Sequence, residues 1–229
     1  MDKVTREDAG PVTVLEIGAG AGNTAFPVLA QNKNPKLRLH ACDFSKKAVE
    51  VMRSHESYNP EHMQADVWDV AGDELPPDLG EGSVDVAILV FIFSALSPLQ
   101  WRKAVENVYR VLKPGGEVCF RDYGRGDLAQ VRFKKGRYLE ENFYIRGDGT
   151  RVYFFEKDEL TEIWGGKPKT TSEASEASEE PSGPSDVEGL QPTPAFEIEE
   201  LGVDRRLLVN RAKQLKMYRC WIQGRFRKT

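Results

Sequence analysis

The alternation of short apolar segments with amphipathic ones over residues 12–118 is the feature that most limits how this chain can fold. Runs typical of buried strands lie at 12–17, 36–43, 62–67, 83–93 and 116–123. Patterns typical of helices lie at 23–32, 45–55 and 98–112. Strands that alternate with helices form βαβ units, which build a parallel sheet. We therefore predict a doubly wound α/β fold with helices on both faces of the sheet.

Residues that begin and end helices fit this pattern. Ser45 is placed to cap the second helix, and Pro98 marks the start of the third. The third helix ends at the Lys-Pro-Gly-Gly run of 113–116, because proline and glycine do not continue a helix.

The second half of the chain is less regular. Segment 147–164 reads as a turn, a short strand and a helix, and segments 196–210 and 214–227 as two strands joined by a basic turn. We expect these two strands to complete the same sheet, so that residues 1–229 form a single domain. Between them and the helix, 165–194 is rich in Ser, Glu, Pro and Gly, and we predict that it is a disordered insertion.

Composition excludes several classes of protein. The chain has 229 residues, of which 40% are apolar and 30% charged, as is typical of globular domains. Its three cysteines are too few and too scattered for a disulfide framework or a metal site, and we expect reduced thiols. The first ten residues lack the apolar core of a secretory signal. The longest apolar run, 84–96, is broken by Asp85 and is too short to span a bilayer.

Charge is unevenly distributed along the chain. The net charge is −4, but 172–200 holds nine acidic residues and no basic one, whereas 201–229 holds nine Lys and Arg and one Asp. Such asymmetry indicates an anionic partner for the basic part, although a solvated basic surface explains the charge equally well.

A glycine loop follows the first strand, in the sequence Gly18-Ala19-Gly20-Ala21-Gly22. A strand, a tight glycine turn and a helix start form a cofactor loop, in which free N–H groups can face the ligand. Glu16 precedes the loop, and Asp43 ends the next strand, where a carboxylate can accept both ribose hydroxyls. Asp66 ends the third strand, where it can meet an adenine amine. Caps at strand ends are the alternative for both aspartates.

Two observations favour S-adenosylmethionine over NAD as the cofactor. The glycines Gly18, Gly20 and Gly22 are spaced by two, unlike the G-x-G-x-x-G loop that holds a pyrophosphate. The segment "VYRVLKPGGEV" at 108–118 also resembles the helix–turn–strand signature of Class I methyltransferases.

Longer motifs narrow the resemblance. Segments 121–160 ("RDYGRGDLAQVRFKKGRYLEENFYIRGDGTRVYFFEKDEL") and 203–228 resemble the central and C-terminal signatures of the tRNA N3-methylcytidine methyltransferases of the methyltransferase-like family. "LEIGAGAGNTAFPVL" and "HACDFSKKAVEVMRSH" resemble the cofactor half of that family. The resemblance implies a mostly parallel, seven-stranded Rossmann-like sheet with an antiparallel final strand.

The same resemblance implies an activity and a set of cofactor contacts. The reaction would be S-adenosylmethionine-dependent methylation at N3 of cytidine 32 in the anticodon loop of tRNA. Gly18 and the neighbouring backbone, including Gly20, would meet the methionine part, with Glu16 beside them. The remaining cofactor residues would be Asp43 at the ribose, Asp66 and Val67 at the adenine, and Val90 on the pocket floor.

The acceptor chemistry suggests two further residues. Cytosine N3 has a free lone pair at neutral pH and needs no general base, so the enzyme must mainly align it with the methyl group. The methylated base is cationic, and a carboxylate or an aromatic face would stabilise it. Asp122, at the end of the fifth strand, and Tyr123 beside it are our catalytic candidates. The alternative is that Asp122 forms a salt bridge with Arg121 and that Tyr123 packs in the core.

An anticodon-loop substrate also needs basic residues around the site. We predict RNA contacts from Arg121, from a first basic strip and from a second strip; the strips comprise Arg132, Lys134, Lys135, Arg137 and Arg146, and Arg205, Arg206 and Arg211. Of Phe133, Phe143 and Tyr144, we expect at least two to pack in the core and the remainder to stack on bases. Trp101 is predicted to be structural, and the histidines show no metal-ligand spacing.

Some features depart from the family pattern. Only about ten residues precede the glycine strand, so the Trp- and Lys-rich N-terminal segment of the family is expected to be missing. Ser97 stands where the family often has His. The family implies tRNA as partner, with a helper such as an aminoacyl-tRNA synthetase, no membrane and no metal, in the cytoplasm or nucleus. A catalytically silent cofactor-fold subunit and a methyltransferase for a protein or small molecule are the alternatives.

Overall fold

The computed structural model describes residues 2–165, 194–211 and 215–229. The predicted insertion at 165–194 lies outside the described residues, apart from its two end positions. The strands are β1 Val12–Ile17, β2 Leu37–Asp43, β3 Met63–Val67, β4 Val84–Val90, β5 Leu112–Tyr123, β6 Tyr138–Glu140, β7 Phe143–Ile145, β8 Arg151–Tyr153, β9 Phe196–Asn210 and β10 Leu215–Lys228. The helices are α1 Asp2–Thr5, α2 Ala25–Ala30, α3 Lys46–Arg53, η1 Phe93–Ala95, α4 Pro98–Val111, α5 Leu128–Val131 and α6 Lys157–Gly165.

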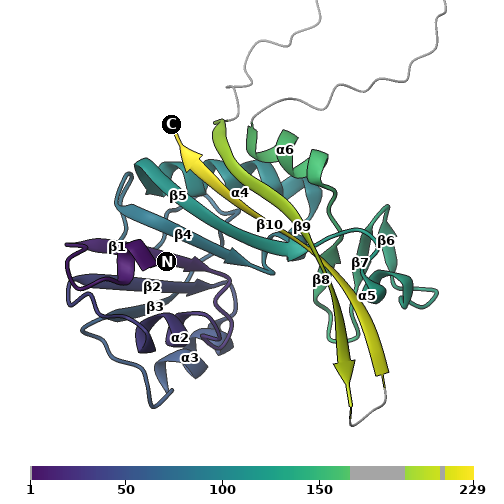
Figure 1. The fold of residues 1–229 in the computed structure, drawn as a ribbon, viewed down its shortest axis with the longest axis horizontal. Helices are drawn as coiled ribbons and strands as arrows, with labels where there is room; N and C mark the ends of the chain where they lie inside the picture. The colour runs from purple at the N-terminus through teal and green to yellow at the C-terminus, as the bar shows by residue number, and fades with distance from the viewer. Residues whose placement is uncertain (1, 166–193, 212–214) are drawn as a thin grey trace, which may run out of the picture.

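Seven strands form one twisted sheet in the order β3-β2-β1-β4-β5-β10-β9 (Figure 1). The pairs β3/β2, β2/β1, β1/β4 and β4/β5 are parallel, whereas β10 runs antiparallel to both β5 and β9. This arrangement confirms the predicted fold class, including the antiparallel final strand. The order reverses beside β1, so the ends of β1 and β4 flank the switch point where ligands of open α/β sheets bind.

Two apolar clusters hold helices against opposite faces of the sheet. One contains Val105 and Val108 of α4 and Trp164 of α6, and the other contains Ala25 of α2 and Met52 of α3. Alternate residues of β1 belong to different clusters, as expected for a strand buried on both faces. The doubly wound arrangement therefore follows directly from the apolar patterns of the sequence.

The helix boundaries confirm most of the expected caps. The Ser45 hydroxyl accepts a hydrogen bond from Ala48 N–H at the start of α3, and α4 begins at Pro98. Helix α2 is shorter than the predicted 23–32, because the glycine loop continues to Thr24. Pro27 is tolerated in α2 because it lies in the first turn, where an N–H has no intrahelical partner.

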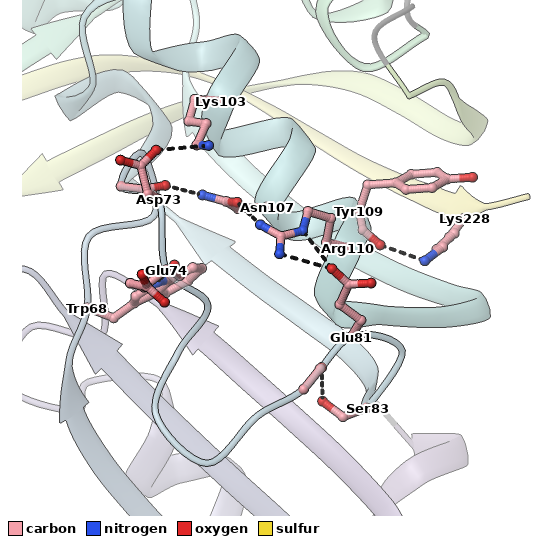
Figure 2. Close-up of polar contacts among 12 residues, drawn as sticks. Trp68, Asp73, Glu74, Glu81, Ser83, Lys103, Asn107, Tyr109, Arg110 and Lys228 are labelled. Atoms are coloured by element: carbon pink, nitrogen blue, oxygen red, sulfur yellow. Dashed lines mark hydrogen bonds and ion pairs between the residues drawn. The ribbon is translucent and has the colours of Figure 1, made fainter. Parts of the chain in front are cut away.

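No helix crosses from β3 to β4 within the described residues 68–83, and the loop is held by α4 instead (Figure 2). The buried Asn107 side chain donates to the carbonyls of Val70 and Gly72, over 2.9 and 2.7 Å. Lys103 pairs with Asp73, and Arg110 of α4 pairs with Glu81. Trp68 is buried under this loop and donates to the Glu74 carbonyl. These contacts fix the segment that follows β3.

A second sheet, β6-β7-β8, lies between β5 and α6. Of its three strands, the sequence patterns predicted only β8. Its strands are three residues long, too short to show an alternating pattern. On the other side, β10 pairs with β5 only as far as Trp221 and Tyr123. The outer part of the β9–β10 hairpin therefore extends past the end of β5, next to α5 (Figure 1). Among the described residues, no helix combines the length and apolar character needed to cross a bilayer.

Candidate active site

The glycine loop lies at the carboxyl ends of the parallel strands and is bonded internally. Gly18 and Ala19 N–H both donate to the Cys42 carbonyl, over 2.8 and 3.0 Å. Gly20 N–H donates to Asp43 Oδ2 over 2.8 Å. The expectation that free N–H groups of the loop face a ligand is therefore wrong for these three amides, because neighbouring groups of β2 already accept from them.

The three glycines of the loop serve different purposes, although all have left-handed φ values. A Cβ on Gly18 would lie 2.5 Å from Ile92 Cγ1, and a Cβ on Gly22 would lie 2.4 Å from Phe26 Cε2. Both glycines thus let protein side chains approach the backbone. A Cβ on Gly20 would have no atom within 4 Å. Gly20 therefore borders open space, which is where a ligand can approach the loop.

Two carboxylates lie close to the loop: Asp43 accepts from Gly20 N–H, and Glu16 interacts with Thr24 and the Ala25 backbone, where α2 begins. Glu16 is 3% exposed, and its Oε2 has no hydrogen-bond partner among the described residues. Burial is the main cause that raises the pKa of Glu16 to about 7; the charge of Asp43 contributes to the rise, and hydrogen bonds from the Thr24 side chain and the Ala25 backbone oppose it. Asp43 accepts one backbone N–H on each oxygen, from Gly20 and Ser45, over 2.8 Å each. Each Asp43 oxygen keeps a lone pair, so the carboxylate can still accept two hydroxyl groups.

At the end of β3, the Asp66 carboxylate already has partners, whereas the sequence suggested that it could meet an adenine amine. Asp66 Oδ1 pairs with Arg53 of α3 over 2.8 Å, and its Oδ2 accepts from Gln64 over 2.8 Å. A contact between Asp66 and an adenine amine would have to share these oxygens, and it stays a prediction. Val67, next along the chain, is 41% exposed and offers an apolar surface at the same edge.

The end of β4 carries a strained residue that the sequence patterns missed. Val90 is partly buried and lines a cavity of about 330 Å³ over β4, β5 and β10. Phe91 follows it with a φ of +57°, a conformation that a bulky side chain adopts at a cost. Its N–H donates to the Arg121 carbonyl, and Ile92 then packs on Gly18. The strain brings the β4–α4 loop against the glycine loop.

Asp122 is buried rather than facing an open site. Its side chain has 0% exposure and accepts from Ser94 N–H and from its neighbour Tyr123 N–H, over 2.9 and 2.8 Å. Burial raises its pKa to about 6. The alternative of a salt bridge to Arg121 is wrong, because Arg121 pairs with Asp204 at 3.1 Å. Asp122 thus anchors the β4–α4 loop, and direct contact with a substrate does not fit its burial.

Tyr123, at the end of β5, belongs to a group of three rings with Phe91, just after β4, and Trp221, in the middle of β10. Its ring lies 4.7 Å from Phe91, and Phe91 lies 6.1 Å from Trp221. Guanidinium groups flank these rings: Arg146 and Arg219 lie 5.2 and 5.7 Å from the Tyr123 ring. Trp221 and Arg219 were not singled out from the sequence, although their alternation of basic and aromatic residues in the last strand is a usable signal.

The predicted RNA-contacting residues fall on two neighbouring surfaces. Exposed members of the first strip are Arg132, Lys134, Lys135 and Arg137, at the end of α5 and just after it, whereas Arg146 is half-buried beside the Tyr123 ring. Exposed members of the second strip are Arg205, Arg206 and Arg211, on the hairpin. The strips come near each other because Arg132 lines one cavity with Arg219 of β10, and Arg219 pairs in register with Arg206 of the second strip. Arg206 and Arg121 share Asp204, so these two are paired rather than free.

The aromatic expectations were partly met. Phe143 is 4% exposed and packs in the core, whereas Phe133 stacks on Tyr144 with ring centroids 4.7 Å apart. Trp101 contacts core rings, including Phe93, as expected of a structural residue. Within the described residues, no three His, Cys, Asp or Glu side chains are grouped to hold a metal ion.

Comparison with known proteins shows what this chain is similar to. The profile of a methyltransferase-domain family matches residues 15–118, which include the glycine loop. The tRNA(Thr) (cytosine(32)-N(3))-methyltransferase of Saccharomyces cerevisiae is 50% identical over 97% of this chain. The tRNA N(3)-methylcytidine methyltransferase trm140 of Schizosaccharomyces pombe is 48% identical over 97% of the chain. Nearly the whole chain is therefore similar to proteins named as tRNA N3-methylcytidine methyltransferases, and it contains a methyltransferase domain.

The chain spans only part of the length of the tRNA N3-methylcytidine methyltransferases that it resembles. It covers 31% of the Saccharomyces cerevisiae protein and 64% of the Schizosaccharomyces pombe protein. The tRNA N(3)-cytidine methyltransferase METTL2 of Bos taurus, 45% identical over 94% of this chain, is covered to 50%. The matched part contains the candidate site described above.

Solved structures agree on the fold of this chain. A SAM-dependent methyltransferase from Methanosarcina mazei matches with a TM-score of 0.64 at 15% identity, covering 99% of this chain and 95% of its own. A Burkholderia thailandensis N1-methyltransferase with bound S-adenosylhomocysteine matches with a TM-score of 0.54 at 17% identity, covering 96% and 72%. The fold is therefore that of the Rossmann-like, S-adenosylmethionine-dependent Class I methyltransferases.

Proposed function

We propose that this chain is the methyltransferase domain of an S-adenosylmethionine-dependent enzyme that forms N3-methylcytidine at position 32 of the tRNA anticodon loop. One observation carries the proposal: two relatives named for N3 methylation in tRNA are 48–50% identical over 97% of the chain. Both the cofactor side and the basic acceptor side lie within this match. The proposed substrate favours a cytoplasmic or nuclear location, and tRNA choice would involve a protein helper such as an aminoacyl-tRNA synthetase.

The glycine loop and its two carboxylates fit the proposed cofactor. The buried, unpaired Oε2 of Glu16 is suited to accept from the ammonium group of the methionine part, which would also favour its ionised form. Asp43 keeps two lone pairs for ribose hydroxyls, and the open side of Gly20 leaves room for close approach. Val67 and Val90 would contribute apolar contacts, and Asp66 would reach the adenine only by sharing its present partners.

S-adenosylmethionine supplies an electrophilic methyl group when it is bound. The acceptor N3 needs no proton removed, so the contribution of the chain is to orient the base and exclude water. Tyr123 is suited to contact the base, since its ring is held by Phe91 at the end of β4. Asp122 would act as a positioning residue, because its buried carboxylate holds the Ser94 backbone and with it the β4–α4 loop.

The position of N3 determines how the RNA must enter. N3 lies on the Watson–Crick edge, so the base has to leave any pairing and enter the site. An anticodon loop makes this step cheap, because its bases are partly unstacked already. The basic strips would hold the flanking phosphates, with Arg132, Lys134 and Lys135 on one side and Arg205 and Arg211 on the other.

Calorimetry and a transfer assay test the proposal in two steps. Wild-type protein should bind S-adenosylmethionine, and the D43A variant should bind it at least tenfold more weakly, because its ribose acceptors are removed. Protein incubated with labelled cofactor and bulk tRNA, then digested to nucleosides, should yield labelled N3-methylcytidine. Cofactor binding without transfer would make the chain a binding subunit, and label in another product would overturn the acceptor assignment. Unchanged binding by D43A would overturn the cofactor site.

A further inference from the structure

A cavity of about 300 Å³ lies between α5 and the hairpin strand β10, outside the cofactor site. Its walls are formed by Leu128, Ala129, Arg132, Phe133, Met217 and Arg219. Four of these residues are apolar, and the other two are arginines from different elements. The volume is at the lower end of the range for small-molecule sites, about 300–1,000 Å³. Apolar walls with two cations suit a flat, uncharged group that carries an anionic substituent.

A buried carboxylate fixes one of the two arginines. Arg219 Nε donates to Asp127 Oδ2 over 2.8 Å and to Oδ1 over 3.2 Å. Asp127 has 0% exposure and also accepts from Ala129 N–H and Cys220 N–H. The terminal nitrogens of Arg219 donate no hydrogen bond to any residue that the structure describes. The guanidinium is therefore held by one edge, while its outer fork is free to contact a phosphate or a base edge.

The cavity adjoins the proposed acceptor site. The Arg219 guanidinium carbon lies 5.7 Å from the centre of the Tyr123 ring and 5.3 Å from that of Trp221. On the opposite wall, Phe133 is held by stacking on Tyr144, with an interplanar angle of 16°. An RNA strand that places one base at Tyr123 must place the adjacent base nearby, since consecutive nucleotides are covalently linked.

We propose that this cavity is a second nucleotide subsite, which takes the base adjacent to the acceptor cytidine, and this inference rests on the proposed function. The base would lie against Phe133 and Met217, because an aromatic face and a polarisable thioether both favour contact with a flat ring. Its phosphate would be bound by the free fork of Arg219 and by the exposed Arg132. The subsite would hold the loop in an unstacked conformation while the acceptor base is at Tyr123.

Filling the cavity from either wall tests the inference. We would titrate the full chain with a fluorescent anticodon stem-loop RNA, using wild type, the cavity-filling variants M217W and A129F, and the control V131W. Val131 lies on the same helix as Ala129 but is 75% exposed and does not line the cavity. Each variant is then measured with RNAs that lack the base on the 5′ or the 3′ side of the acceptor. Cofactor calorimetry on every variant shows that it is folded.

For intact RNA, we expect each filling variant to weaken binding about tenfold, as removal of one stacked base does, with V131W unchanged. Removing the base that occupies the subsite should weaken RNA binding by wild type to a similar extent. The same removal should not weaken RNA binding by the filling variants any further. The inference would be overturned if both filling variants bound the intact RNA as tightly as wild type does. It would also be overturned if cavity filling and removal of either neighbouring base weakened RNA binding independently of each other. If wild type still forms N3-methylcytidine in that case, the proposed function survives alone; if wild type neither binds nor methylates the RNA, both fail.

Discussion

At the scale of single residues, burial changes what Glu16 does. Its folded-state pKa of about 7 lies above the ordinary value of 4.5, because the carboxylate is removed from water and faces Asp43. The folded protein therefore holds this proton more tightly than the unfolded chain does. Below pH 4.5, Glu16 is protonated in both the folded and the unfolded state, and its contribution to the free energy of unfolding is fully present. As the pH rises through 7, that contribution is lost.

We predict that unfolding free energy falls between pH 5 and pH 8 by up to about 3 kcal/mol through Glu16. The E16Q variant cannot ionise at this position and should lose much less stability over the same range. Urea denaturation at both pH values measures the difference. Parallel losses in wild type and E16Q would show that Glu16 is not the group that titrates.

Two glycines of the same loop give a matched pair of substitutions. G18A places a Cβ 2.5 Å from Ile92 at a φ of +72°, and we expect it to cost about 2 kcal/mol or more in stability. G20A meets no atom within 4 Å, so it should cost only about 1 kcal/mol of left-handed strain. If the open side of Gly20 receives the cofactor, G20A should nevertheless weaken S-adenosylmethionine binding at least tenfold. Denaturation and calorimetry on both variants separate these effects, and normal binding by G20A would contradict this account of the loop.

At the scale of elements, the sequence predicts those features of the fold that depend on local residue patterns. The strand–helix alternation, the Ser45 cap and the antiparallel C-terminal strands could be predicted because each depends on neighbouring residues. The sheet β6-β7-β8 could not, since three-residue strands have no period. Contacts such as Asp127 with Arg219, 92 positions apart, depend on how distant elements meet. For the same reason, the sequence did not predict that Arg121 pairs with Asp204 instead of with Asp122, the partner considered as an alternative.

Asp127 ties α5 to the final strand, and we predict a large effect on its removal. D127A deletes the cap of α5 and leaves Arg219 without its carboxylate, which should cost about 3 kcal/mol. D8A is the matched control, because Asp8 pairs with Arg6 on the surface and its removal should leave stability nearly unchanged. Urea denaturation of the two variants gives the comparison. A cost for D127A below about 1 kcal/mol would show that the hairpin does not need this contact.

At the scale of the whole molecule, the site and the basic strips lie on one side of the sheet. The parallel strands end at the glycine loop and at Tyr123, and the hairpin and α5 continue outward from that edge (Figure 1). Lys33 and Lys36 precede β2 and so lie toward the opposite edge. This polarity predicts that RNA binding depends on where a lysine lies as well as on the total charge.

Replacing Lys134 and Lys135 together by Ala should therefore reduce the salt dependence of tRNA binding. The slope of log K against log salt should fall by about 1.5, since each lost phosphate contact removes about 0.7–0.9. Replacing Lys33 and Lys36 removes the same charge from the far edge and should leave the slope nearly unchanged. Titrations at several salt concentrations measure both, with cofactor binding as a check. Equal slopes for the two double variants would contradict the placement of the strip.

One aspartate also sets how much of the hairpin charge a polyanion can meet. Asp204 holds Arg121 and Arg206 together, so two guanidinium groups and one carboxylate amount to a single positive charge. Counting arginines in the sequence thus overstates the number of counterions that RNA would displace on docking. The β9–β10 hairpin therefore carries less net positive charge than its number of arginines implies. Its discrimination between nucleic acids would come more from contacts with aromatic rings than from electrostatic attraction.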